Sequence, residues 1–275
     1  MSQTLETGYV AVDGGELYYE AVGSGLPLVF IHAGVADSRM WDAQVAHFSP
    51  KYRVIRYDTR GFGRSKTEAV SFSNRQDLLA VLDHCKVDRA ILIGNSRGGS
   101  IAIDSTLSFP DRVKGLVVLG SGLGGFGSEE IPPDLVEPIG KMQAAQEAKD
   151  WALLAELEAR FWADGPNQPA GRADNAVYEV VRSMTYENYI NQPVEAAAQP
   201  LDPPAIGRLA EIQVPLLIFI GLLDEADCVE AAKYMAEHVT NAQYVAFPDV
   251  AHMVSLEKPQ EFNRIIDEFI DRNHL

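Results

Sequence analysis

The chain has 275 residues, of which 47% are hydrophobic, and its formal net charge is −16. This length suits one large domain or two small ones with a sizeable core, and the acidic balance argues against nucleic acid or anionic lipid as a partner. The sequence opens with no signal-peptide pattern and holds no apolar run long enough for a membrane span, so we expect a cytoplasmic protein without membrane association.

Eight short hydrophobic runs predict the strands of one sheet. The first two, 9–12 and 16–21, surround Asp13-Gly14-Gly15 and predict a hairpin. The others are 26–32, 52–58, 89–95, 113–120, 214–221 and 243–249. Most of these are continuous runs of Val, Ile and Leu, as in parallel strands that are buried on both faces. Helical patterns alternate with them, one beginning at the capping-box-like Ser73-Asn74-Arg75-Gln76. The alternation indicates an open α/β sheet.

One long segment, from about Gly127 to Pro204, contains no strand candidate. Its apolar residues instead fall on two helical faces, which are Leu153, Leu154, Leu157 and Phe161, and then Val177, Val180, Val181 and Met184. We therefore predict that residues 127–204 are a helical insertion into a core formed by 1–126 and 205–275. An exposed apolar face on the insertion would support a homodimer.

The motif that carries chemistry is Gly94-Asn95-Ser96-Arg97-Gly98, which fits G-x-S-x-G between a predicted strand and a predicted helix. This context is that of a nucleophile elbow, in which a serine sits on a strained bend and the glycines remove steric clashes. A plain Gly/Ser turn would give the same letters, so the motif alone does not decide between the two interpretations.

A serine nucleophile needs a general base, and the base needs an acid that orients it. The best base among the six histidines is His252, because it follows the last predicted strand at the edge where open α/β sheets bind ligands. Asp224 follows the strand before it, with Glu225 and Asp227 as rivals in the same loop. The order along the chain is then Ser, acid, His.

Further motifs extend the pattern over nearly the whole chain. They are His32-Ala33-Gly34 with Trp41 downstream, Asp58-Thr59-Arg60-Gly61-Phe62-Gly63-Arg64-Ser65, Gly221-Leu222-Leu223-Asp224, and Glu257-Lys258-Pro259. With these motifs the chain resembles the α/β-hydrolase fold superfamily, in its serine hydrolase form. The resemblance implies a mostly parallel eight-stranded sheet flanked by helices, with the helical insertion as a cap over the active site.

The resemblance also implies the roles of individual residues. Ser96 attacks a carbonyl carbon, His252 transfers the proton, and Asp224 orients the imidazole. The backbone N–H groups of Gly34 and Arg97 form the oxyanion hole. No metal or cofactor is implied. His32 orders its loop, and Asp58, Arg60 and Ser65 are structural.

Two departures from the family pattern, Ala33 and Ala251 in place of glycine, concern loop geometry. A third is Arg97, where a small or apolar residue is common. Its guanidinium would either bind a substrate carboxylate or pair with an acidic side chain of the cap or sheet rim. With 39 acidic residues in the chain, we favour the ion pair. Trp162 of the insertion is a further candidate for contact with substrate.

The sequence thus predicts a carboxylesterase-like enzyme that hydrolyses a small-molecule ester or lactone through an acyl-enzyme. An alternative is hydrolysis of a carbon–carbon bond in a diketone-like acid, because such enzymes often carry Gly-Asn-Ser-x-Gly-Gly, although the loop after His32 lacks their glycine- and serine-rich composition. A cofactor-free haloperoxidase or perhydrolase is a further alternative. A ligand receptor that kept the fold without turnover belongs to a different class.

Overall fold

The computed structural model describes residues 4–127, 130–191 and 196–275. In this part of the chain eight strands follow one another in the main sheet, in the order β1-β2-β4-β3-β7-β8-β10-β11. Their bounds are Glu6–Val12 (β1), Gly15–Val22 (β2), Pro27–Ile31 (β3), Arg53–Tyr57 (β4), Ala90–Asn95 (β7), Val113–Leu119 (β8), Leu216–Gly221 (β10) and Ala242–Phe247 (β11). β2 pairs antiparallel with β1 and β4, and the remaining pairs along this path are parallel. The predicted sheet is therefore confirmed.

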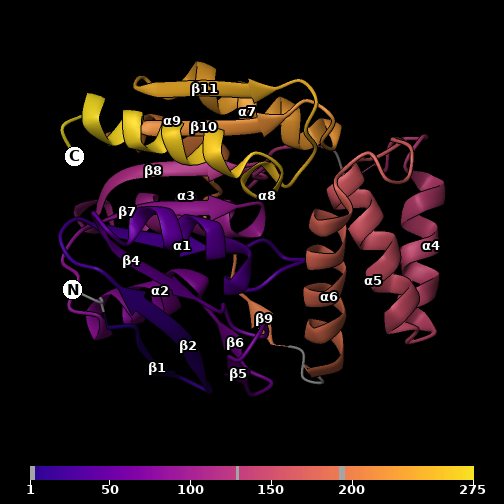
Figure 1. The fold of residues 1–275 in the computed structure, drawn as a ribbon, viewed down its shortest axis with the longest axis horizontal. Coiled ribbons are helices and arrows are strands. Elements are labelled where there is room, and N and C mark those ends of the chain that lie inside the picture. Colours follow the sequence, from indigo (N-terminus) through magenta and orange to yellow (C-terminus); the bar gives the residue numbers. More distant parts are fainter. Residues whose placement is uncertain (1–3, 128–129, 192–195) are drawn as a thin grey trace.

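Helices cover both faces of the sheet (Figure 1). One face carries α1 (Asp42–Phe48), α8 (Val254–Glu257) and α9 (Pro259–Arg272), and the other carries α2 (Asn74–His84), α3 (Arg97–Ser108) and α7 (Ala226–His238). Successive strand residues feed the two cores in turn, so that Phe219 packs with residues of α9 while Ile218 and Ile220 pack with residues of α3 and α7. Because both faces are covered, the strand sequences are continuously apolar.

The helices α4 (Val136–Glu147), α5 (Trp151–Ala159) and α6 (Asn175–Asn191), with the π-helical turn η3 (Arg160–Asp164) after α5, lie between β8 and β10 in the sequence and beside the sheet in space (Figure 1). We call these elements the cap helices. They bury Val177, Val181 and Met184 of α6, as predicted. On α5, Leu154 is buried as predicted, but the prediction is wrong at Leu153, which is 43% exposed, because α5 turns Ala155 inward instead.

Three two-residue strands were not predicted, because so short a strand leaves no periodic pattern. β5 (Lys66–Thr67) pairs with β2, and β6 (Ser71–Phe72) pairs with β9 (Ala197–Ala198) in a separate ribbon. The expectation of no strand between Gly127 and Pro204 is therefore wrong at β9.

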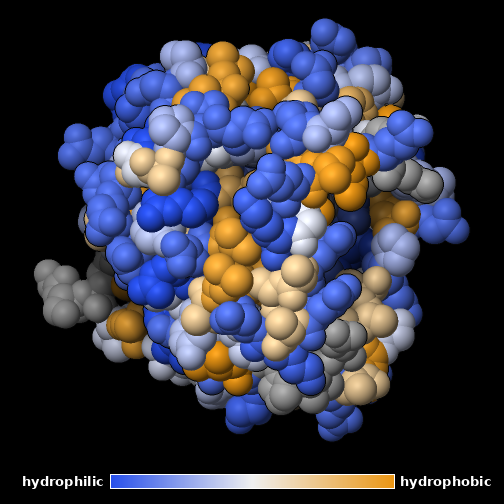
Figure 2. All heavy atoms as spheres, turned by 90° about the vertical axis from the view of Figure 1, so that its right-hand side faces the viewer, coloured by the Kyte–Doolittle hydropathy of each residue, from blue (hydrophilic) through white to orange (hydrophobic). Residues whose placement is uncertain are grey.

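Hydrophobic side chains lie among hydrophilic ones on the side of the cap helices, which Figure 2 shows. Val136, Leu153, Tyr186 and Ile190 are the large exposed hydrophobic residues within these helices. None of the helices in the described residues combines the length and the apolar character needed to cross a membrane.

Candidate active site

Ser96 occupies a strained bend between β7 and α3, with φ 53° and ψ −119°. A non-glycine residue adopts such a positive φ only where the surrounding structure enforces it. A Cβ atom at Gly94 would collide with the carbonyl of Gly98, and one at Gly98 would collide with the carbonyl of Ile31. Both glycines are therefore required by backbone packing, as the elbow interpretation predicts.

The imidazole of His252 lies against the carboxylate of Asp224, with Nδ1 at 2.9 Å from Oδ1 and 2.8 Å from Oδ2. Both side chains are buried. The contact places the Nδ1 proton toward the carboxylate and leaves Nε2 available. Within the described residues the imidazole has no hydrogen bond to the Ser96 hydroxyl. Of the three candidate acids, the structure thus places Asp224, and neither Glu225 nor Asp227, against His252.

The chain around Gly120 joins the elbow to this pair. Ser96 N donates to the carbonyl of Leu119 over 2.7 Å. At the next residue, Gly120, a Cβ atom would lie 2.9 Å from Asp224 Oδ2 and 3.0 Å from His252 Nδ1. The three predicted residues Ser96, Asp224 and His252 therefore meet at the carboxyl edge of the sheet.

Trp162 of η3 packs its ring on the imidazole of His252, with 4.4 Å between the ring centroids. Trp162 does not line the cavity described below. The structure thus places this residue, predicted as a substrate contact, against the base. A π-helical turn frequently marks a functional position, but the letters of the sequence carried no sign of it.

The loop after β3 is held by His32, as predicted. His32 Nδ1 donates to the carbonyl of Ala33 over 2.8 Å, and Thr59 N donates to His32 Nε2 over 2.9 Å. Burial lowers the pKa of His32, which keeps the ring neutral and suits this donor–acceptor arrangement. Gly34 then lies beside Arg97, because a Cβ atom at position 34 would be 3.8 Å from Arg97 Cδ.

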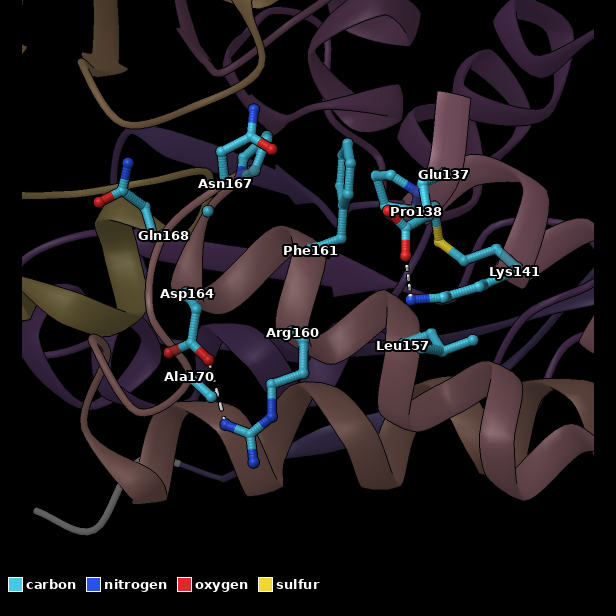
Figure 3. Close-up of a pocket in the computed structure, with 13 residues that line it drawn as sticks. Glu137, Pro138, Lys141, Leu157, Arg160, Phe161, Asp164, Asn167, Gln168 and Ala170 are labelled. Atoms are coloured by element: carbon cyan, nitrogen blue, oxygen red, sulfur yellow. Dashed lines mark hydrogen bonds and ion pairs between the residues drawn. The ribbon is translucent and has the colours of Figure 1, made fainter. Parts of the chain in front are cut away.

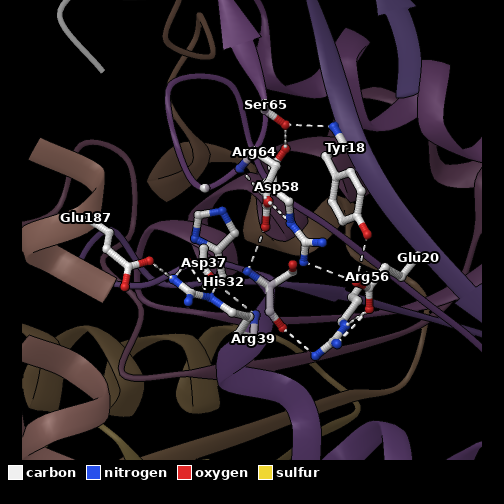
Figure 4. Close-up of polar contacts among 12 residues, drawn as sticks. Tyr18, Glu20, His32, Asp37, Arg39, Arg56, Asp58, Arg64, Ser65 and Glu187 are labelled. Atoms are coloured by element: carbon white, nitrogen blue, oxygen red, sulfur yellow. Dashed lines mark hydrogen bonds and ion pairs between the residues drawn. The ribbon is translucent and has the colours of Figure 1, made fainter. Parts of the chain in front are cut away.

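Beneath this loop, Asp58 organises a buried polar network (Figure 4). Its carboxylate accepts from Ser38 N over 2.9 Å and from Arg64 N over 2.8 Å. Ser65 Oγ donates to the Asp58 carbonyl over 2.5 Å and accepts from Tyr18 N over 2.8 Å. These bonds support the structural role predicted for Asp58 and Ser65.

The guanidinium of Arg97 has neutral partners. Nη1 donates to Thr59 Oγ1 over 2.6 Å, Nη2 donates to Asn74 Oδ1 over 3.1 Å, and the group stacks on Phe62 at 4.7 Å from the ring centroid. Among the described residues no carboxylate lies within 4.0 Å of it, since Asp77 is engaged by Arg60. The ion pair that we favoured for Arg97 is therefore wrong.

A cavity of about 780 Å³ opens beside Gly34 and Arg97. Its lining residues come from the core and the cap helices and include four aromatic ones. They are Gly34, Arg60, Gly61, Phe62, Phe72, Arg97, Gln146, Lys149, Trp151, Thr185, Asn188, Tyr189, Ile190, Ala196 and Ala198. We call this space the elbow cavity. Arg60, predicted as structural, both pairs with Asp77 and lines this cavity.

A second cavity, of about 310 Å³, lies within the cap helices (Figure 3). Its charged side chains pair with one another, Glu137 with Lys141 at 2.7 Å and Arg160 with Asp164 at 3.0 Å. Neither Ser96 nor His252 lines this second cavity. They do not line the elbow cavity either, but Arg97, the residue directly after Ser96, does.

Asp224, Cys228 and His252 have side-chain ligand atoms within 4.8 Å of one another. They do not suit a metal ion, because Asp224 and His252 already bind each other and burial raises the pKa of the Cys228 thiol well above its usual range. A protonated thiol is a poor ligand.

Arg172 is a residue of this region that the sequence did not indicate. It binds both carboxylate oxygens of Glu257, at 2.7 and 2.8 Å, and the carbonyl of Asp249 at 2.7 Å. Glu257 also accepts from Ala251 N, next to His252, over 3.1 Å. The segment between η3 and α6 is thereby tied to the histidine loop.

Comparison with known proteins identifies the family. The family model described as "Alpha/beta hydrolase family" matches residues 28–265. The chain belongs to this family. It is 30% identical to a 2-hydroxy-6-oxononadienedioate/2-hydroxy-6-oxononatrienedioate hydrolase of Burkholderia vietnamiensis, over 98% of this chain and 97% of that protein. It is 27% identical to 3-oxoadipate enol-lactonase 2 of Acinetobacter baylyi, over 89% and 88% of the two chains.

A solved structure of another protein agrees with that assignment. The structure titled "Est816 as an N-Acyl homoserine lactone degrading enzyme" superposes with a TM-score of 0.75 at 30% identity, and covers 95% of this chain and 100% of that one. The family and these relatives make the protein a hydrolase, and the relatives differ in the substrates that their names give.

Proposed function

We propose that this α/β hydrolase cleaves a carboxylic ester or lactone of a small molecule through an acyl-enzyme formed on Ser96. The observation that carries the proposal is the Asp224–His252 pair, at 2.8 Å, beside a serine held at φ 53°. Such an arrangement supplies a nucleophile, a base and an orienting acid.

In the first half-reaction, His252 Nε2 removes the proton from Ser96 Oγ, and Oγ attacks the carbonyl carbon. The backbone N–H groups of Arg97 and Gly34 hold the oxyanion, and the alcohol leaves with the proton from His252. Water then attacks the acyl-enzyme with His252 as the base, which releases the acid and restores Ser96. Because the serine and the imidazole are not hydrogen-bonded here, bound substrate or a turn of the Ser96 side chain must complete this contact.

The test is the hydrolysis of p-nitrophenyl esters from acetate to octanoate by wild type and Ser96→Ala. We expect turnover by wild type and its loss in Ser96→Ala. Ser100→Ala is the matched control, since Ser100 lies on the next turn of α3 and donates to the carbonyl of Gly122. Equal turnover by wild type and Ser96→Ala would contradict the proposal.

Carbon–carbon bond hydrolysis is a second candidate, favoured by the Gly-Asn-Ser-x-Gly-Gly sequence and by the name of the 30% identical relative. It is tested with 2-hydroxy-6-oxononadienedioate, whose conjugated absorption disappears on cleavage. Rapid loss of this absorption by wild type, together with no turnover of any ester, would replace the ester proposal with this one.

A further inference from the structure

The elbow cavity is cationic in an acidic protein. The chain has 39 acidic and 23 basic residues, yet the charged residues that line this cavity are Arg60, Arg97 and Lys149, and none of the lining residues is acidic. Asp77 neutralises Arg60 through two hydrogen bonds of 2.9 and 2.8 Å. Arg97 and Lys149 have no ion pair with any described residue, so the cavity keeps positive charge.

Arg97 is held in place by neutral groups. Each terminal nitrogen of its guanidinium donates one hydrogen bond, Nη1 to Thr59 and Nη2 to Asn74, and the guanidinium plane packs on the ring of Phe62. A guanidinium has five N–H donors, so these two bonds leave three for a ligand. Burial lowers the pKa of Arg97 to about 10, so the group remains a cation at neutral pH. A desolvated cation without a counterion is costly, which indicates a site that an anion completes.

The positive charge of Arg97 belongs to the residue next to the proposed nucleophile. It follows Ser96 directly, its side chain passes beside Gly34, and both Arg97 and Gly34 line the elbow cavity. We propose that the Arg97 guanidinium binds a carboxylate of the substrate, so that the enzyme selects carboxylate-bearing esters or lactones. The inference rests on the proposed function, which it narrows to one substrate class.

The paired charges of the second cavity sharpen the contrast. Glu137 with Lys141 and Arg160 with Asp164 leave no net charge among its ionisable lining residues (Figure 3). The charged side chains of the second cavity are thus paired, whereas Arg97 and Lys149 of the elbow cavity have no ion pair with a described residue.

The test compares phenyl hydrogen glutarate with methyl phenyl glutarate, which differ only in the free carboxylate, and follows phenol release. A second pair, 3-acetoxybenzoate and its methyl ester, places the carboxylate on the alcohol side. We expect wild type to prefer the acid of at least one pair in kcat/KM. We expect Arg97→Met to reduce that preference by about tenfold to a hundredfold, as for the loss of a charge-assisted hydrogen bond, and Arg97→Lys to retain part of it.

The ratio within a pair is the readout because the backbone N–H of Arg97 also serves the oxyanion. Lys66→Met is the matched control. It removes one positive charge from an exposed pair with Glu16, outside the cavity, and should leave the ratio unchanged. A wild type that hydrolyses both neutral esters as fast as their acids would overturn the inference while the ester hydrolase proposal stands.

If neither these pairs nor the p-nitrophenyl esters are turned over, the ester proposal fails and the inference is tested by binding. Calorimetry with glutarate and glutaramide on wild type and Arg97→Met then decides. Tighter binding of glutarate that Arg97→Met weakens at least about tenfold supports the carboxylate site. Equal affinity of the two proteins for glutarate, or no binding, overturns it.

Discussion

The side-chain amide of Asn95 donates a hydrogen bond to the backbone carbonyl of His252 over 3.4 Å and another to the carbonyl of Leu119 over 3.2 Å. Asn95 precedes the nucleophile, so one buried amide connects the strand that carries Ser96 with the loop that carries the base. The two catalytic segments are 157 residues apart in the chain. Their relative position therefore depends in part on this side chain.

Replacing Asn95 with alanine should reduce kcat more than it changes KM. Small displacements between nucleophile and base cost up to about a hundredfold in rate, and we expect a loss of about tenfold to a hundredfold. Steady-state kinetics on the best p-nitrophenyl ester measure it. Asn273→Ala removes an amide that donates to the carbonyl of Phe269 at the end of α9 and serves as the control. An unchanged kcat in Asn95→Ala would show that the bond does not position the loop.

Asp224→Asn should reduce kcat by about a thousandfold to ten-thousandfold, because a carboxamide neither fixes the Nδ1–H tautomer of His252 nor stabilises its cation. Asp227→Asn is matched in chemistry and lies three residues further along the chain, in the first turn of α7. It should leave kcat nearly unchanged. A large loss in Asp227→Asn with a small one in Asp224→Asn would reverse the assignment of the acid.

The features of the site that the sequence predicted well are those that a short stretch of sequence specifies. The strand of apolar residues before Gly94, the glycines around Ser96, and the positions of Asp224 and His252 just after strands all follow from spacing and from the geometry of parallel sheets. Each of these patterns lies within a stretch of about ten residues, so it can be recognised from the sequence alone.

The partners of Arg97 and Arg172 could not be predicted in this way. Arg97 is held by Thr59 and Asn74, and Arg172 by Glu257, which lies 85 residues away. Because acidic residues are in excess, we expected an ion pair for Arg97. Composition does not say which carboxylates are bound by other cationic side chains, as Asp77 is by Arg60. Such pairings depend on tertiary contacts and leave no local pattern.

Gly98→Ala should destabilise the fold strongly, because the new Cβ atom would meet the backbone carbonyls of Ile31 and His32, which cannot move aside without distorting β3. We expect a loss of about 3 kcal/mol or more in the free energy of unfolding, measured by urea denaturation. Gly140→Ala is the control, since nothing lies within 4 Å of its Cβ position in α4. That substitution should stabilise by about 0.5–1 kcal/mol through helix propensity. Similar stability of the two variants would contradict the packing argument.

Arg172→Met should destabilise the protein by about 3 kcal/mol, because it leaves the largely buried carboxylate of Glu257 without its partner. We also expect kcat to fall, since Glu257 holds Ala251 N beside His252. Arg182→Met, which breaks an exposed pair with Glu179, should change stability by less than about 0.5 kcal/mol. If both variants unfold at the wild-type urea concentration, the Arg172 pair contributes nothing to the attachment of the cap helices.

Glu158 of α5 should make stability fall as the pH rises. Its carboxylate accepts from Tyr189 Oη over 2.9 Å, and burial raises its pKa from 4.5 to about 7. Between about pH 4.5 and about pH 7 the folded protein therefore binds more protons than the unfolded chain, and the free energy of unfolding decreases across this window. The decrease is of order 1–3 kcal/mol.

Glu158→Gln removes the ionisation and keeps an acceptor for Tyr189. Urea denaturation should give this variant a stability close to that of wild type at about pH 4.5 and a higher one at about pH 8.5. Glu156→Gln, at an exposed position of the same helix, is the control and should follow wild type at both pH values. Parallel pH profiles for Glu158→Gln and wild type would mean that Glu158 ionises in the folded protein as readily as in the unfolded chain. Tyr189 lines the elbow cavity and stacks on Trp151, with 5.3 Å between the ring centroids. Ionisation of Glu158 would therefore also affect two residues that line this cavity.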